Sequence, residues 1–156
     1  MTDIKLPNEH LKALKTAREA IQKEGIEKKG KNEHFGNTYA TLDDIIDKCE
    51  AKLLENNLLT SFTQTYDNVD KDKVEQYQCF YTMRITHVPS MRYVESHITL
   101  YSDRRPQQLG SCMTYAKRYL YQNMLMLKTY EEQDDDGNKA DASMKGKVVS
   151  KINREI

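Results

Sequence analysis

The chain has 156 residues, of which 38% are hydrophobic and 31% charged, with 24 basic and 24 acidic side chains. This length accommodates one domain with a core of its own plus tails, and no apolar run approaches the roughly 20 residues that a membrane span requires. The first residues lack the apolar segment of a signal peptide, and the three widely spaced cysteines are typical of reduced thiols. We therefore expect a cytoplasmic protein rather than a secreted or membrane protein.

The net charge of zero conceals two segments of opposite charge. Residues 84–128 contain seven lysines or arginines against two acids, whereas residues 131–141 contain six acids and one lysine. A local basic surface suits an anionic partner even where the whole chain is neutral.

Two helices are predicted in the N-terminal third. The first is expected over residues 7–24, where apolar residues recur at helical spacing, and a polar, basic loop follows over residues 25–40. Thr41 and Asp44 have the spacing of a capping box, so the second helix should begin directly after Thr41 and end near Asn56. The narrow apolar stripe of the first helix suits either the core or a contact between subunits, and it comprises Leu11, Leu14, Ala17 and Ile21. The buried face predicted for the second helix comprises Leu42, Ile45, Ile46, Cys49, Leu53 and Leu54.

Three strands joined by short polar turns are predicted next, over residues 58–66, 74–88 and 93–101. Consecutive strands of this kind form an antiparallel meander. Alternation in the second and third strands predicts that the inward side chains are Tyr77, Cys79, Tyr81, Met83, Ile85, Val94, Ile98 and Leu100.

A third helix is predicted after residues 102–108, and its apolar stripe comprises Leu109, Met113, Ala116, Leu120, Met124 and Leu127. Residues 131–156 are acidic and then small and basic, which is typical of a flexible tail. The element order is therefore α-α-β-β-β-α, and we expect an α+β domain over residues 1–130 followed by a tail over residues 131–156.

Two motifs that bind cofactors in other proteins are present only in part. Residues 25–32 approach the phosphate-binding pattern G-x-x-x-x-G-K-[ST], but Asn32 lacks the required hydroxyl and a helix precedes the loop, so no ATPase is predicted. The acidic run Asp134–Asp136 lacks the bidentate glutamate of a calcium loop. No nucleophile, acid–base pair or metal-ligand spacing stands out, so we predict no catalytic residue, no metal site and no cofactor, and leave a dependence on Mg²⁺ open.

The third helix and its approach combine cations with aromatic rings. Arg104 and Arg105 precede the helix, and Lys117 and Arg118 follow within it. Tyr115 and Tyr119 lie beside them in the sequence. Cations of this kind bind phosphates and tyrosine rings stack on bases of any sequence. An ordinary solvated basic face with tyrosines that cover the core would leave the same pattern, and composition alone does not decide between them.

Two blocks of sequence resemble a known family. The first is FGNTYATLDDI over residues 35–45, and the second is PQQLGSCMTYAKRYLYQNML over residues 106–125, followed by DDDGNKA over residues 134–140. They are similar to the Erf (essential recombination function) family of phage single-strand DNA annealing proteins. Departures from the family pattern occur at four positions, where this chain has Asn57, Gln108, Cys112 and Lys117.

The resemblance implies a protein without ATP hydrolysis that forms rings or helical filaments on single-stranded DNA and promotes the annealing of complementary strands. It also implies the fold of ring-forming annealing proteins, a β-meander with a helix packed across it, and the cytoplasm of a bacterial host. The predicted DNA-binding residues are Arg104, Arg105, Tyr115, Lys117, Arg118, Tyr119, Tyr39 and Lys31. The remaining motif residues, with structural roles, are Gln107, Gly110, Ser111, Thr114, Thr41, Ala40 and Leu42.

Three other readings remain open at this point. The protein could bind and protect single strands without annealing them, it could be a metal-dependent nuclease that uses Asp134–Asp136, or it could be a structural oligomer with an incidental basic face. A host single-strand binding protein and a phage exonuclease are additional partners that the resemblance allows.

Overall fold

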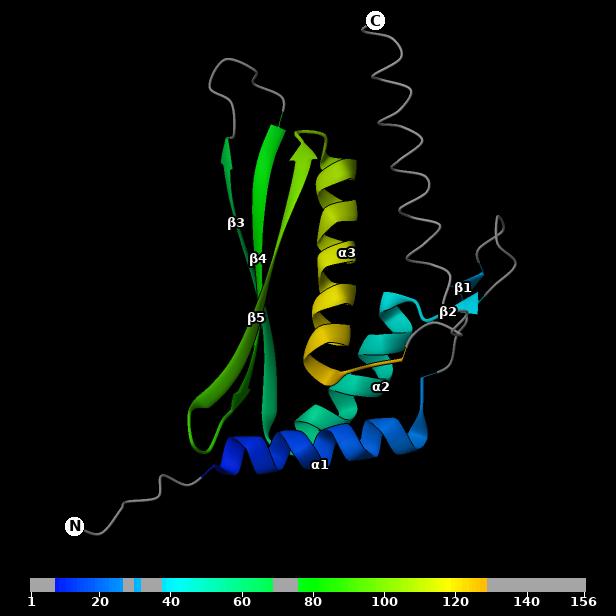
Figure 1. Ribbon diagram of the computed structural model, residues 1–156, viewed down its shortest axis with the longest axis vertical. Coiled ribbons are helices and arrows are strands. Elements are labelled where there is room, and N and C mark those ends of the chain that lie inside the picture. Colours follow the sequence, from blue (N-terminus) through cyan, green and yellow to red (C-terminus); the bar gives the residue numbers. More distant parts are fainter. Residues whose placement is uncertain (1–7, 27–29, 32–37, 69–75, 129–156) are drawn as a thin grey trace, which may run out of the picture.

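The structure is a computed structural model that describes residues 8–26, 30–31, 38–68 and 76–128 (Figure 1). In chain order its elements are α1 (Glu9–Glu24), β1 (Gly30–Lys31), β2 (Thr38–Tyr39), α2 (Leu42–Glu55), β3 (Leu58–Asn68), β4 (Gln76–His87), β5 (Arg92–Asp103) and α3 (Pro106–Leu125). The predicted order of three helices and three main strands is confirmed. The short pair β1–β2 lies within the segment predicted to be a loop, and the predicted tail over residues 131–156 lies outside the described residues.

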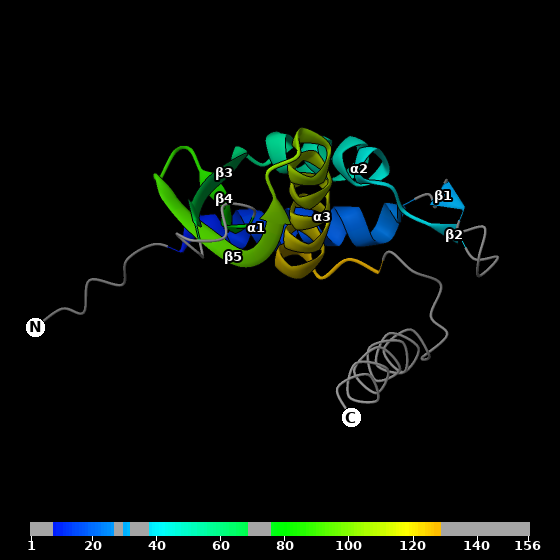
Figure 2. The same cartoon turned by 90° about the horizontal axis from the view of Figure 1, so that it is seen from above.

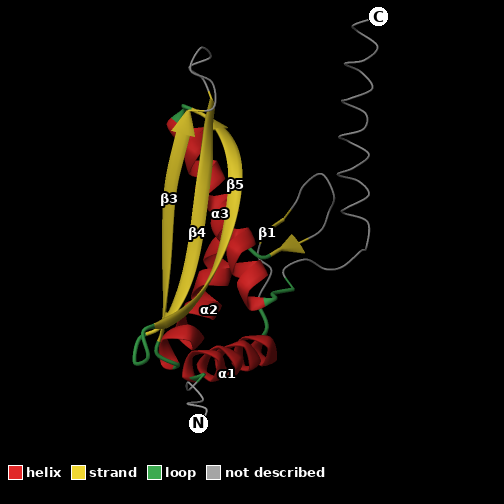
Figure 3. Ribbon diagram, turned by 60° about the vertical axis from the view of Figure 1, so that its left-hand side comes forward, coloured by secondary structure: helices red, strands yellow, loops and turns green. Residues whose placement is uncertain are grey.

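The three long strands form one antiparallel sheet in the order β3-β4-β5, which confirms the meander. The register pairs Leu58 with His87 in the first hairpin and Gln76 with Asp103 in the second. The three helices all lie on one side of this sheet (Figure 3). Helix α3 packs along β5 and β4, as the view from above shows (Figure 2), while α1 packs against α2 near one end of the strands (Figure 1).

Alternation in β4 follows the prediction, because Cys79, Tyr81, Met83 and Ile85 are all buried against the helices. The intervening residues of β4 point to the opposite side of the sheet, where Phe80 is exposed. A sheet covered on one side by helices produces this pattern of buried and accessible side chains. The predicted inward residues of β5 are partly buried and pack against the same core.

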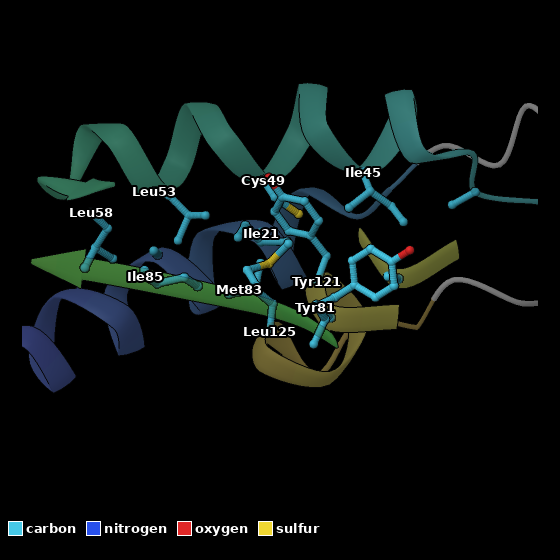
Figure 4. Close-up of a cluster of buried hydrophobic side chains, with 14 of the residues drawn as sticks. Ile21, Ile45, Cys49, Leu53, Leu58, Tyr81, Met83, Ile85, Tyr121 and Leu125 are labelled. Carbon is cyan, nitrogen blue, oxygen red and sulfur yellow. The ribbon is translucent and has the colours of Figure 1, made fainter. Parts of the chain in front are cut away.

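The core lies between the sheet and all three helices (Figure 4). Helix α2 contributes Ile45, Cys49 and Leu53, each completely buried. A partly buried hydrogen bond joins α3 to α2, since the Tyr121 hydroxyl donates to the Glu50 carboxylate at 2.6 Å. Burial, and then this hydrogen bond, raise the pKa of the Tyr121 hydroxyl, so the donor stays protonated.

Both ends of α2 form as the sequence predicts. The Thr41 side chain accepts a hydrogen bond from the Asp44 backbone N–H at 3.2 Å, and the Asp44 carboxylate accepts one from the Thr41 N–H at 2.8 Å. This reciprocal pair is a capping box. Asn57 ends the helix with φ of 59°, a left-handed conformation that asparagine tolerates better than most residues.

One expected core position is wrong. Leu54 is exposed, because the adjacent Leu53 lies on the buried side of α2. In the stripe of α1, Ala17 and Ile21 are buried in the core, whereas Leu11 is exposed. Helix α3 ends at Leu125, where Met126 adopts a left-handed conformation, so Leu127 lies beyond the end of the helix although it packs against the core. Ala116 and Leu120 of the predicted stripe are buried, and Tyr121 and Leu125 are buried in addition.

None of the helices that the structure describes is long and apolar enough to cross a membrane.

Replacing Thr41 by alanine should lower the free energy of unfolding by about 1 kcal/mol, because the Asp44 N–H at the start of α2 loses its acceptor. Urea denaturation followed by circular dichroism measures the change. Thr16→Ala is the matched control, since Thr16 is exposed within α1 and its hydroxyl bonds only the Lys12 carbonyl. Equal stability of Thr41→Ala and the wild type would contradict the role of the cap.

Candidate nucleic-acid interface

Helix α3 starts at the end of β5, after a turn of two residues. Pro106 occupies the first turn, where its fixed φ suits a helix and its missing N–H costs nothing. The buried side of the helix includes Cys112, Ala116 and Leu120, which are spaced four residues apart. This spacing fixes the rotation of the helix and therefore determines which side chains point away from the sheet.

The outward side of α3 carries most of the family-like motif. A shallow depression of about 550 Å³ is open to solvent there. Its lining residues, which we call the outer face of α3, are Gln107, Gly110, Ser111, Thr114, Tyr115 and Arg118. The structure thus brings together six of the predicted site residues on one accessible surface.

Within the outer face, two hydroxyl groups bond the backbone of their own helix. Ser111 donates to the Gln107 carbonyl at 3.0 Å, and Thr114 donates to the Gly110 carbonyl at 3.2 Å. Each hydroxyl oxygen keeps lone pairs that can accept a further hydrogen bond.

A glycine at the start of a helix, such as Gly110, permits either close packing or the approach of a phosphate. A Cβ atom added there would have no neighbour within 4 Å in the described structure. Packing within the chain therefore does not require glycine, and the packing interpretation is wrong for the described residues. The backbone is accessible to whatever occupies the outer face.

Tyr115 and Tyr119 form an exposed aromatic pair. Their ring centroids are 4.3 Å apart with an angle of 34° between the ring planes. The two residues are 44% and 36% exposed, so part of each side chain is accessible to solvent. Accessible ring surface next to Arg118 is what a base-stacking site requires.

Lys117 does not share this surface. Neighbouring residues of a helix point about 100° apart, so Lys117 and Arg118 diverge. The Lys117 ammonium group lies 5.0 Å from the ring centroid of Phe62 in β3, on the flank opposite Tyr119. The two cations of α3 therefore lie on two different surfaces, whereas the sequence predicted a single one.

Arg104 and Arg105 are adjacent in the sequence, but their side chains contact different residues. The Arg105 guanidinium donates to the Asp103 carboxylate at 2.6 and 2.9 Å, and the Arg105 N–H donates to the same group. The hydrogen bonds from Arg105 hold the pKa of Asp103 below its usual value. Because Asp103 compensates its charge, Arg105 attracts an anion less than predicted. Arg104 instead lies 5.1 Å from the centre of the Tyr77 ring.

Three aromatic residues of the sheet were not among the predicted site residues. Phe62, Tyr66 and Tyr77 lie near Arg104 and Lys117 on the side of the sheet that the helices cover. The alternation of β4 correctly predicts that Tyr77 lies on the inner side of the sheet. Its neighbours in β3 and its contact with Arg104 could not be predicted in this way, because they depend on the register of the strands.

Two predicted DNA-binding residues lie at the edge of what the structure describes. The backbone of Lys31 pairs with Thr38 and that of Tyr39 with Gly30 in the β1–β2 pair, while their side chains lie outside the described part. Thr41 has the structural role predicted for it, as the cap of α2. The acidic run at 134–136 also lies outside the described residues, within which no cluster of metal-ligating side chains occurs.

Comparison with known families identifies the family of this chain. The model of the ERF superfamily matches residues 11–154. The protein belongs to the ERF superfamily. A search among curated proteins found no match, and a search among solved structures found none. The match spans all three helices and the sheet, so the domain described here is that of the ERF superfamily.

Replacing Gly110 by alanine should raise the free energy of unfolding by about 0.5 to 1 kcal/mol, because the added methyl group enters open space and alanine favours the helix. Thermal unfolding measures the effect. Gly25→Ala is the contrasting variant, since Gly25 has φ of 73° and alanine there is strained. A destabilised Gly110→Ala protein would mean that the position is packed.

Proposed function

We propose that this ERF superfamily protein binds single-stranded DNA and promotes annealing of complementary strands during homologous recombination of a phage or prophage. The observation that carries the proposal is the outer face of α3. It places Tyr115 beside Arg118 and an accessible glycine, on a helix that contains no acidic residue, and the Tyr115 ring pairs with that of the exposed Tyr119.

The chemistry of this face suits an unpaired polynucleotide. Arg118 provides a charge for a phosphate, and Tyr115 with Tyr119 provides a ring surface for a base. A duplex buries the flat faces of its bases between neighbouring base pairs, so it offers the tyrosine pair little to stack on. The site should therefore prefer single strands to duplex.

Annealing then needs no covalent chemistry from the protein. A strand held by its phosphates keeps its pairing edges accessible, and a second strand pairs through its own stacking and hydrogen bonds. Neither ATP nor a catalytic residue has a part in this scheme, and we propose that the protein is not an enzyme.

Assembly of several copies, as a ring or helical filament, would multiply weak contacts along one strand. Several apolar side chains of the described surface are available for contacts between copies, namely Leu11, Leu54, Val88, Met91 and Met126. The expected setting is the cytoplasm of a bacterial host, where a host single-strand binding protein and a phage exonuclease are candidate partners.

The purified protein should accelerate the pairing of two complementary oligonucleotides, one with a donor fluorophore and one with an acceptor, in the absence of any nucleotide. The rate without protein is the reference, and size-exclusion chromatography of the same sample shows whether annealing accompanies assembly. Omitting Mg²⁺ tests for a metal requirement.

Other outcomes of this assay identify the alternatives. Slower pairing than in protein-free buffer would indicate a protein that protects single strands. Shortened strands in the presence of Mg²⁺ or Mn²⁺ would indicate a nuclease. Assembly without any retention of DNA would indicate a structural oligomer and end the proposal.

Arg118→Gln should weaken binding to a thymine oligomer and reduce the slope of log affinity against log salt concentration by about 0.7, the value for one phosphate contact on a single strand. Fluorescence anisotropy at several salt concentrations measures both. Arg18→Gln is the matched control, because Arg18 is a half-buried arginine on α1. An unchanged slope in Arg118→Gln would mean that α3 binds no phosphate through this side chain.

A further inference from the structure

Strand β3 carries a second aromatic surface, separate from the outer face of α3. Residues 58, 62 and 66 of this strand share the helix-facing side, and their exposure increases along the strand. Leu58 is buried and Phe62 is half-buried, whereas Tyr66 is 55% exposed. A large ring on the inner side of a sheet is usually covered, so its exposure here calls for an explanation.

Tyr66 belongs to one of two neighbouring sets of rings and cations on the helix-facing side of the sheet. Its ring centroid lies 5.0 Å from that of Tyr77 in β4, and the Arg104 guanidinium lies 5.1 Å from the Tyr77 centroid on the path from β5 to α3. Phe62 forms the other set with Lys117, whose ammonium group is 5.0 Å from its ring. We call these five residues the β3–β4 aromatic patch. It lies toward the end of the sheet where α3 begins (Figure 1).

The two charged side chains of the patch, Arg104 and Lys117, are both positive. Neither β4 nor α3 contains an aspartate or glutamate, and the one acid of β3 is Asp67, whose position in the alternation is opposite to that of Tyr66. Arg104 and Lys117 each lie near an aromatic ring here. A partner with flat apolar surfaces joined by negative charges is complementary to this arrangement.

We propose that the β3–β4 aromatic patch is a second contact surface for single-stranded nucleic acid, in which an unpaired base stacks on Tyr66 and Tyr77 and Arg104 and Lys117 bind the adjoining phosphates. This proposal rests on the proposed function and adds a site to it. The outer face of α3 and the patch lie on different sides of one helix, because Arg118 and Lys117 diverge.

Stacking at the patch is compatible with annealing. A tyrosine ring covers the flat face of a base and leaves its pairing edge free. Since any base has such a face, the patch should hold a strand without regard to its sequence. Two contact surfaces in each copy, repeated over an assembly, would bind a long strand more tightly than either surface alone.

The test separates base stacking from phosphate binding by comparing a thymine oligomer with an abasic oligomer of the same length. Fluorescence anisotropy of the full-length protein should show tighter binding of the thymine oligomer by at least about fivefold, the lower end expected for one stacked base. Tyr66→Leu should lose most of that preference, because leucine keeps an apolar side chain but has no ring.

Tyr101→Leu is the matched control. Tyr101 is 60% exposed in β5 near the same end of the sheet, and it occupies the side opposite to Tyr66. This variant should keep the preference for thymine. Retention of the preference in Tyr66→Leu, or an equal loss in Tyr101→Leu, would overturn the proposal while leaving the annealing function in place.

Photochemical cross-linking provides a readout that does not require a variant to fold. Irradiation of the wild-type protein with an oligomer that contains 5-iodouracil should attach it to Tyr66 or Tyr77, as mapped by mass spectrometry. Cross-links confined to Tyr115 and Tyr119 would overturn the patch. A wild-type protein that binds neither oligomer in dilute buffer would end the proposed function as well.

Discussion

The packing of one side of α3 against β4 and β5 is the constraint on which the candidate interface depends. Ala116 and Leu120 must be buried there, and the hydrogen bond from Tyr121 to Glu50 fixes the same helix against α2. A helix held at two sides cannot rotate without exposing apolar area at about 25 cal/mol per Å² and losing a partly buried hydrogen bond. The directions of Lys117 and Arg118 are consequences of that packing.

Much of the fold can be predicted from the sequence, because the patterns that specify its elements each lie within a short stretch of residues. The capping box at Thr41, the left-handed asparagine after α2 and the alternation of β4 each depend on residues within a few positions of one another. The sequence-based predictions fail where contacts between residues distant in the sequence determine the structure. Tyr121 is buried where its hydroxyl bonds Glu50 of α2, and β1 pairs with β2 within a segment whose sequence shows no strand pattern.

The residues of the candidate site could largely be predicted from the sequence, but their arrangement in space could not. The sequence identified the cations and tyrosines of α3, and their order alone suggested one cluster. Rotation of the helix divides that cluster, with Tyr115, Tyr119 and Arg118 on accessible sides and Lys117 beside β3. The ion pair between Arg105 and Asp103 could be inferred from spacing, although only the structure shows that it forms. The exposure of Tyr66 depends on how three elements pack together, so no pattern within a short stretch of sequence predicts it.

This division bears on how a strand could be held without being hidden. A single deep cleft lined with bases and cations would bind tightly but would cover the edges through which a complementary strand pairs. Shallow surfaces avoid that conflict, since rings stack on base faces and cations bind phosphates while the pairing edges stay in solvent. Each contact is then weak, and the strength must come from repetition along the strand. The proposed assembly of copies follows from the shallowness of the surfaces that each copy provides.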